Sequence, residues 1–300
     1  MSLKIYDIEA GKFAEEKICA ESFMRFLYRN PLGAAALCGV FKRAFFSRAC
    51  GVWANSKASR KAIVKFAADN GIDLSESRNP PVSFRCFNDF FTRELRSDAR
   101  PLAEGENPRA VSFPSDGRHL LLENVSEADV FYAKGQRFNL AKFLGDAKLA
   151  ERFSGGAMLI SRLSPLDYHR FHFPVSGEIA ARKTINGDLF SVSPIALAPR
   201  LSILWENKRI LNIIGSREFG MCAFVEIGAT NVGTIINLAE IGSRAERGAQ
   251  AGYFKLGASC VATLFESSAK IDWNAELVRM SRDGIECYAR ANTLAGVLLK

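Results

Sequence analysis

The chain has 300 residues, of which 48% are hydrophobic and 24% are charged, a composition typical of a folded globular protein and not of a disordered one. Its seven cysteines are odd in number and form no CxxC or CxxxC pair, which argues against a disulfide framework or a zinc ribbon and favours a reducing, cytosolic setting. The formal net charge is +8, so the distribution of the basic residues matters.

The N-terminal stretch is not predicted to direct secretion or to span a membrane. Met1–Glu16 contains four acidic residues and lacks the apolar core that precedes the cleavage site of a secretory signal. No uncharged run in the chain reaches eighteen residues, about the minimum for a transmembrane helix.

The net positive charge belongs to one segment. Between Glu21 and Lys65 there are nine basic residues and one acidic residue. The remainder of the chain is neutral, with 40 − 9 = 31 basic and 32 − 1 = 31 acidic residues. The nine are Arg25, Arg29, Lys42, Arg43, Arg48, Lys57, Arg60, Lys61 and Lys65.

The same segment is predicted to be helical and amphipathic. Asn30 followed by Pro31 is typical of an N-cap and first helical turn, and Ser56 is expected to open a second basic helix that Gly71 closes. Apolar residues recur at helical spacing after Pro31, and a shorter apolar stripe precedes it. They are Leu37, Val40, Phe41, Ala44 and Phe45, and before the proline Phe23, Phe26 and Leu27.

An apolar face bordered by Lys and Arg suits the surface of an anionic membrane, where each basic residue contributes about 1 kcal/mol. We therefore expect residues 21–65 to contact a membrane, with a helical hairpin packed on its own protein as the alternative. Nucleic acid is not expected as a partner, because no nucleic-acid-binding motif accompanies the basic residues.

Beyond this segment the pattern changes from helix to strand. Phe87–Leu95 predicts a short helix, and the Pro-, Gly- and charge-rich residues 96–109 predict a linker. The segments rich in β-branched and aromatic residues are Ala157–Leu163, Cys222–Ile227, Val232–Asn237 and Tyr253–Phe265, interrupted by helical patterns at Phe138–Leu144 and Ala147–Phe153.

These elements predict an α+β fold, with a mainly antiparallel β core and an N-terminal basic amphipathic helical region. We expect a helical membrane-associating region at 1–95 and a catalytic β-rich domain at 96–300.

Two polar motifs precede the last strands. Asp116 lies in Pro114–Gly117, where an Asp-Gly pair more often marks a turn than a catalytic site. His169 and His172 lie in Asp167–Pro174, and on an extended strand two residues three apart point to opposite faces. Separate roles are therefore expected for the two imidazoles. No metal site is predicted, because paired histidine ligands would stand two apart on a strand or four apart on a helix.

Ser259 follows two small residues inside an apolar segment. It does not form a nucleophile elbow, because Val261 stands where that motif requires glycine. A glycine ahead of a strand residue marks a bulge equally well. Taken alone, this segment leaves a reactive serine and an ordinary strand residue open.

The ordered set of motifs resembles the phosphatidylserine decarboxylase family over nearly the full length of the chain. Each segment is weak alone, whereas their common order is specific. The segments are Phe87–Arg93 with Arg100 and Pro101, Pro114–Gly117, Asp167–Pro174, Val225–Ala229 with Val232 and Gly233, and Phe254–Ser259. In that family the serine of a Gly-Ser motif becomes a pyruvoyl group, and its match here is Ser259.

The resemblance implies that the chain cleaves itself between Ala258 and Ser259. The Ser259 hydroxyl would attack the Ala258 carbonyl, giving a β chain of residues 1–258 and an α chain of residues 259–300 that starts with the pyruvoyl cofactor. His172 matches the base that removes the hydroxyl proton, and Asp116 matches the carboxylate that orients it. His169 is assigned a role in substrate contact or proton transfer.

In turnover, the family resemblance implies conversion of phosphatidylserine to phosphatidylethanolamine and CO2 through a pyruvoyl Schiff base, which acts as an electron sink. The expected partners are this phospholipid, an anionic membrane surface contacted through residues 21–65, and the chain's own α and β fragments bound to each other. We expect peripheral attachment to the cytoplasmic face of the cell membrane, and homo-oligomerisation is left open.

Two positions depart from the family pattern. Ala258 replaces the usual glycine, and Cys260 replaces a hydroxyl residue that can form hydrogen bonds during cleavage. Slower maturation is one consequence, and a non-processing homologue that binds membranes is the alternative function. A pyruvoyl decarboxylase of another serine phospholipid or of a free amino acid, and a serine hydrolase, are further alternatives.

Overall fold

A computed structural model describes residues 3–42, 44–126, 138–230, 234–257 and 259–300. It confirms an α+β fold with mostly antiparallel sheets. The helices are α1 (Glu21–Arg29), α2 (Pro31–Ala36), α3 (Ala44–Asn55), α4 (Ala62–Asn70), α5 (Phe87–Phe91), α6 (Leu140–Leu144), α7 (Ala147–Phe153), α8 (Pro194–Leu197), α9 (Ile203–Glu206) and α10 (Ala275–Arg282).

The strands of the described residues form one large sheet and two small ones. The large sheet runs in the order β11 (Arg244–Ala245), β7 (Gly177–Ile185), β8 (Arg209–Ser216), β9 (Gly220–Ile227), β13 (Ser259–Phe265), β5 (Met158–Leu163), β4 (Gly117–Leu122), β15 (Cys287–Ala289), β1 (Leu3–Asp7) and β2 (Lys12–Glu16). The small sheets are β10 (Ile235–Asn237), β12 (Gln250–Phe254), β6 (Arg170–His172), and β14 (Ile271–Trp273), β16 (Leu294–Leu298), β3 (Ala110–Ser112).

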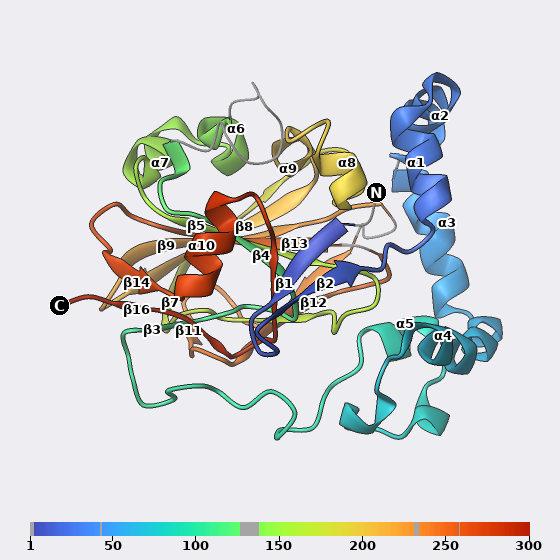
Figure 1. The fold of residues 1–300 in the computed structure, drawn as a ribbon, viewed down its shortest axis with the longest axis horizontal. Coiled ribbons are helices and arrows are strands. Elements are labelled where there is room, and N and C mark those ends of the chain that lie inside the picture. Colours follow the sequence, from blue (N-terminus) through green and yellow to red (C-terminus); the bar gives the residue numbers. More distant parts are fainter. Residues whose placement is uncertain (1–2, 43, 127–137, 231–233, 258) are drawn as a thin grey trace.

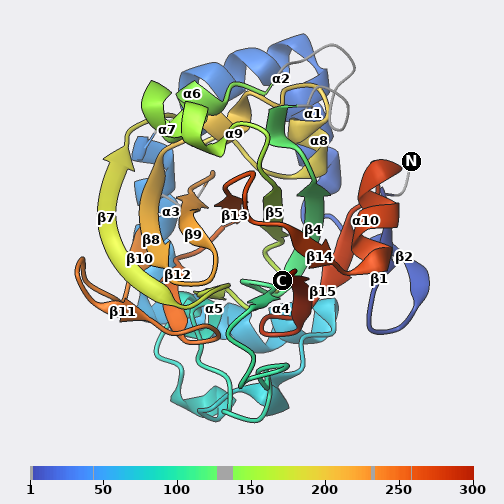
Figure 2. The same cartoon turned by 90° about the vertical axis from the view of Figure 1, so that its left-hand side faces the viewer.

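The large sheet separates two hydrophobic cores. Because successive strand residues point to opposite faces, Cys260 and Ala262 of β13 enter the core beneath α6–α9, whereas Val261 and Phe265 enter the other core. That second core also contains Phe171 of β6, from one of the small sheets. Figure 2 shows α6–α9 above the strands that run from β7 to β4.

The N-terminal helices lie along one side of this β body (Figure 1). The cap predicted at Asn30 is confirmed, since its Oδ1 accepts a hydrogen bond of 2.9 Å from Leu32 N. Gly71 closes α4 as predicted, with a φ of 65° that glycine tolerates. The helix expected after Pro31 is interrupted by a π-helical turn at Leu37–Phe41, and Ser56 precedes a 3₁₀ turn that leads into α4.

Two predicted boundaries were wrong, and one pair of strands was missed. The short helix α5 ends at Phe91 and not at Leu95. The segment Tyr253–Phe265 is not one strand: β12 ends at Phe254 in a small sheet, and β13 begins at Ser259 in the large one. The acidic N-terminus, for which no strand was expected, forms the hairpin β1–β2, and β1 pairs with β15. The division at residue 95 remains a prediction.

Candidate active site

The ends of three neighbouring strands bring two of the predicted site residues, Ser259 and Asp116, to the same end of the large sheet. Ser259, the first residue of β13, pairs with Leu163, the last residue of β5. The neighbouring strand β4 begins at Gly117, next to Asp116, and runs antiparallel to β5. Only glycine fits there, because a Cβ at Gly117 would lie 2.4 Å from the carbonyl oxygen of Arg162. The Asp-Gly pair therefore marks a close strand contact.

Ser259 is fully buried, and its hydroxyl makes no hydrogen bond in the described structure. Within the described part of the chain, its Oγ has no hydrogen-bond partner. Leaving a buried hydroxyl unpaired costs about 1–3 kcal/mol, so such a group calls for an explanation. Gly257 adopts a φ of 134°, which side-chain-bearing residues rarely adopt. Ala258, on the other side of the predicted cleavage bond, lies outside the described residues.

The hydrogen bonds of His172 fix its tautomer. Its Nδ1 lies 2.8 Å from the carbonyl oxygen of Gly248, and a carbonyl only accepts, so Nδ1 carries the proton. Nε2 is left with a lone pair and, among the described residues, without a hydrogen-bond partner. Burial lowers the pKa of His172 below its ordinary value. The ring is therefore neutral near pH 7 and can accept a proton at Nε2.

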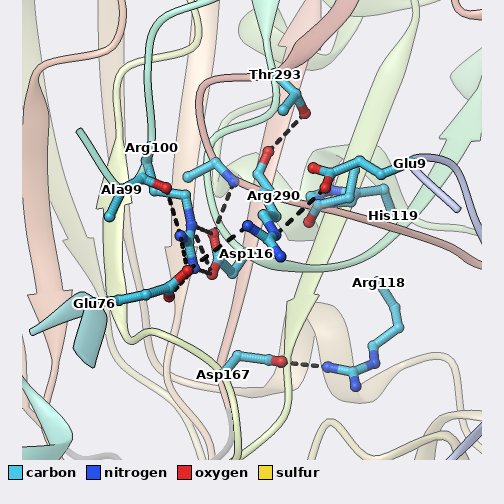
Figure 3. A network of polar contacts seen from close by, with 12 residues as sticks. Glu9, Glu76, Ala99, Arg100, Asp116, Arg118, His119, Asp167, Arg290 and Thr293 are labelled. Carbon is cyan, nitrogen blue, oxygen red and sulfur yellow. Dashed lines mark hydrogen bonds and ion pairs between the residues drawn. The ribbon is translucent and has the colours of Figure 1, made fainter. Parts of the chain in front are cut away.

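Asp116 is buried and binds Arg100, not His172. The carboxylate accepts hydrogen bonds from Arg100 at 2.6 and 2.8 Å and from the backbone N–H of Ala291 at 2.9 Å. Arg100 also holds Glu76 at 3.0 Å, so it bridges two carboxylates (Figure 3).

No hydrogen bond joins Asp116 to His172 in the described structure, although the two groups interact electrostatically. The pKa of His172 is lowered by burial, and the negative charge of Asp116 offsets part of this lowering. The backbone also connects them, because His172 N donates to the carbonyl oxygen of Pro114 at 2.7 Å.

His169 is buried against an aromatic ring. It stacks on Phe91 with a centroid distance of 3.8 Å and an interplanar angle of 21°. Neither ring nitrogen has a hydrogen-bond partner among the residues that the structure describes. Burial lowers the pKa of His169 to about 3, so this ring is neutral near pH 7. His169 and His172 therefore have different surroundings, and the separate roles expected for them remain a prediction.

Asn292, which no sequence motif singled out, connects the backbone of Gly248 with that of Arg100. It is buried, and its Nδ2 donates to Gly248 O at 3.4 Å and to Arg100 O at 3.1 Å. Gly248 O is the oxygen that also holds His172. Asn292 has a φ of 69°, a conformation that asparagine tolerates better than most residues. A lone asparagine after an alanine carries no sequence signal of this role.

A buried cluster of charges borders the site. Arg162 of β5 binds Glu16 of β2 at 2.7 Å and also binds Glu286. Arg118 of β4 pairs with Glu16 and Asp167, and the Arg118–Asp167 pair appears in Figure 3. Asp167 belongs to the histidine motif, so this cluster ties the N-terminal hairpin to the loop that precedes β6.

An apolar cavity of about 230 Å³ reaches this end of the sheet. It lies between α1 and the β body, and Gly257 forms part of its wall. Its other walls include Phe23, Met24, Leu27, Phe41, Phe46, Pro165 and Pro194. The cavity therefore connects the amphipathic helices with the segment before Ser259.

The described residues contain no cluster of three or more histidine, cysteine or acidic side chains that could hold a metal ion, and no helix long and apolar enough to cross a membrane. Val232 and Gly233, part of one motif in the sequence, lie outside the described residues.

Comparisons with known proteins agree with the motif order. A family model described as phosphatidylserine decarboxylase matches residues 87–285. The phosphatidylserine decarboxylase proenzyme of Chlamydia trachomatis serovar L2 is 38% identical over 288 residues, covering 96% of this chain and 95% of the relative. The proenzyme of Fusobacterium nucleatum is 39% identical over 285 residues, which are 94% of each chain.

Proposed function

Because the chain belongs to the phosphatidylserine decarboxylase family, we propose that it converts phosphatidylserine to phosphatidylethanolamine and CO2 after cleaving its own backbone before Ser259. The chain is a carboxy-lyase by its family. The observation that carries the self-cleavage is the fully buried Ser259 hydroxyl, which has no hydrogen-bond partner among the described residues.

In the proposed cleavage, His172 is the base. Its Nε2 lone pair takes the Ser259 hydroxyl proton, while Oγ attacks the Ala258 carbonyl carbon and the peptide C–N bond breaks to give an ester. Loss of the Ser259 Cα proton then eliminates the Ala258 carboxylate, and water releases ammonia from residue 259. The neutral His172 ring, fixed by Gly248, supports this role.

The residues around position 259 suit the pyruvoyl group that the cleavage would leave. A pyruvoyl carbonyl supplies the Schiff-base electron sink for loss of the substrate carboxylate. The conversion removes the hydroxyl donor that is buried without a partner at Ser259. The conformation of Gly257 supports close approach of the backbone at the cleavage point.

The two remaining site residues have supporting roles in the proposal. Asp116, held by Arg100, keeps a negative charge near His172 and stabilises its protonated form after proton transfer. His169 lies neutral against Phe91 and is proposed to contact the substrate or to relay a proton.

The helices α1–α4 are proposed to hold the enzyme on the cytoplasmic face of the cell membrane. They expose large apolar side chains, with exposed fractions of 76% for Leu32, 72% for Phe45 and 73% for Val52. Together with the basic residues of 21–65 they suit an anionic lipid surface. The apolar cavity behind α1 would admit part of a diacyl substrate.

Self-cleavage is tested by intact mass and a denaturing gel of the purified chain. We expect fragments of 258 and 300 − 258 = 42 residues, and a single full-length species for Ser259→Ala. Thr263→Val is the matched control, because Thr263 lies on the same strand and its buried hydroxyl also has no hydrogen-bond partner among the described residues. Full-length wild-type protein with a free Ser259 would favour the non-processing, membrane-binding homologue.

The substrate is tested by CO2 release from phosphatidylserine vesicles and from soluble serine and tryptophan. We expect release from the vesicles, and no release from Ser259→Ala. Release from the free amino acids alone would reject the phospholipid, and release from neither after complete cleavage would point to another serine phospholipid.

A further inference from the structure

A second cavity, of about 550 Å³, lies between α3 and the β body on the other side of the segment that precedes Ser259. Its volume falls within the range of about 300–1,000 Å³ typical of small-ligand sites. One wall is the face of α3 that carries Ser47, Arg48, Gly51, Val52 and Asn55. The other walls are formed by Asn88, Gly187, Leu189, Lys208, Thr234, Lys255 and Leu256.

This cavity, which we call the cationic pocket, is lined by three basic residues and no acidic one. Arg48 and Lys255 make no ion pair with a carboxylate in the part of the chain that the structure describes. Asp188, which follows the lining residue Gly187, is already paired with Lys42 at 2.9 Å. The side chains of Arg48 and Lys255 therefore have unused capacity for an anion.

The walls of the cationic pocket are fixed by hydrogen bonds. The backbone N–H of Leu256 donates to Asn88 Oδ1 at 3.0 Å, and Asn88 Nδ2 donates to Asn55 Oδ1 at 2.9 Å. The backbone N–H of Lys255 donates to Thr234 O at 3.3 Å. These bonds join α3, α5 and the segment before β13, so the basic groups come from elements held together in the folded chain.

The surroundings identify the anion as part of an amphiphile. Lys255 and Leu256 line the cationic pocket, and the next residue, Gly257, lines the apolar cavity. Val52 of the pocket wall and its neighbour on α3, Trp53, are exposed to solvent, with exposed fractions of 73% and 49%. A ligand that fits both features carries an anionic group beside apolar chains.

We propose that the cationic pocket binds the phosphodiester of a phospholipid headgroup, with Arg48 and Lys255 as its main contacts. The choice of a phospholipid rests on the proposed function. A phosphodiester carries one negative charge and accepts hydrogen bonds from both basic side chains and from neighbouring amides.

Binding is tested on the full-length Ser259→Ala chain, which is expected to stay uncleaved. Isothermal titration calorimetry would measure glycerophosphoserine, glycerophosphoethanolamine and inorganic phosphate. We expect both glycerophosphodiesters to bind, with an affinity that falls at least tenfold in Arg48→Gln/Lys255→Gln and falls with rising salt. Lys57→Gln/Lys61→Gln is the matched control, because it removes two exposed charges outside the pocket.

An equal loss in the control pair would overturn the proposal, because it would show attraction by surface charge alone. Tighter binding of inorganic phosphate than of either diester would also overturn it. The single variant Arg48→Gln keeps the test independent of the cleavage segment, because Arg48 lies on α3. This variant should weaken diester binding at least threefold. Unchanged binding in this variant would reject the role of Arg48.

Kinetics on wild-type and Lys255→Gln enzymes distinguish the two sources of the diester. If it belongs to the substrate, the KM for phosphatidylserine in neutral vesicles rises at constant kcat. If the bound diester belongs to a second lipid, phosphatidylglycerol should stimulate the wild-type enzyme and the variant should lose this stimulation. Failure of decarboxylation with diester binding intact would reject the proposed function and leave the pocket as a phosphodiester site.

Discussion

At the scale of single residues, the protonation state of His172 should control maturation. Its folded pKa lies below 6.5 because the ring is buried, and the neutral ring is the form that takes the serine proton. We expect the rate of self-cleavage to be constant above pH 6.5 and to fall as the pH drops through the lowered pKa. A time course of fresh precursor on denaturing gels, between pH 4.5 and 8, measures this.

The His172→Gln variant is the control for that profile. It should lose about 10²-fold or more in cleavage rate, the range expected for removal of a general base, while Ser259 stays in place. A wild-type rate that already falls between pH 8 and 6.5 would contradict the assignment, because it would require a base with a pKa above that of a buried imidazole.

Asn292 is expected to position His172 through the carbonyl of Gly248. Asn292→Gly keeps the left-handed backbone, since glycine adopts a φ of 69° without strain, and removes only the side-chain amide. We expect slower cleavage, by about tenfold for the loss of about 1.4 kcal/mol, and an altered pH midpoint. Rates and pH profiles of the precursor check this.

The comparison variant for Asn292 is Asn292→Asp, which keeps the shape and replaces the donor with a charged acceptor. It should impair cleavage more than Asn292→Gly, because a carboxylate would face the carbonyl oxygens of Gly248 and Arg100. An Asn292→Gly precursor that cleaves at the wild-type rate and pH midpoint would reject the positioning role.

At the scale of elements, the sequence predicted the strands and helices that have strong apolar patterns and missed the strands that lack such a pattern. β5, β9, α6 and α7 lie where apolar patterns predicted them. The hairpin β1–β2 was missed because Leu3–Asp7 and Lys12–Glu16 mix charged and apolar residues. Glu16, the buried end of β2, pairs with Arg162, a residue 146 positions away, and local patterns carry no such information.

The break between β12 and β13 was missed for a related reason. Residues 253–265 form one apolar run in the sequence. Only the strands with which they pair show that Phe254 and Ser259 belong to different sheets. The motif order included Ser259, Asp116, both histidines and Arg100, but it indicated neither the pairing of Arg100 with Asp116 nor the tautomer of His172. Those depend on side-chain partners distant in sequence.

The position of Cys260 also follows from the strand. Its side chain enters the core beneath α6–α9 and is fully buried there, on the face opposite Val261. Burial raises the pKa of the Cys260 thiol to about 12. The side chain that departs from the family pattern at this position therefore lies in the core on the side away from Val261.

In β9, Glu226 is expected to make stability depend on pH. The side chain is fully buried, Asn212 donates to its Oε1 at 2.7 Å, and burial raises the pKa of Glu226 from 4.5 to about 8. The folded state then holds a proton that the unfolded chain releases. The resulting stability is complete below pH 4.5 and is lost as the pH rises to 8, by at most about 1.4 kcal/mol per pH unit.

Glu226→Gln should remove this dependence, because glutamine resembles the protonated acid in shape. Urea unfolding of the uncleaved Ser259→Ala background at pH 5 and pH 8 measures it, with exposed Glu178→Gln as the control. We expect the difference in unfolding free energy between Glu226→Gln and its parent to favour the variant more at pH 8 than at pH 5. An identical difference at both pH values would show that Glu226 is ionised in the folded protein.

At the scale of the whole molecule, cleavage would divide the sheets between two chains. Residues 259–300 supply β13, β14, β15 and β16, and all of these strands except β14 lie between two neighbours. β13 lies between β9 and β5 at the centre of the large sheet, and β15 lies between β4 and β1. Contacts at the site also cross the cut, since Ala291 N binds Asp116 and Glu286 binds Arg162.

The α and β chains should therefore stay together until the fold itself is lost, and unfolding of the cleaved protein should depend on concentration. Two unlinked chains gain about 1.4 kcal/mol in favour of the folded complex for each tenfold rise in concentration. This corresponds to roughly 2–5 °C in Tm for a protein of this size. Ser259→Ala remains one chain, and its Tm should not change. Calorimetry at two concentrations tenfold apart measures both. A cleaved protein that loses its 42-residue fragment on gel filtration would contradict the expectation, because the pairing of β13 with β5 and β9 would then be too weak to hold the chains together.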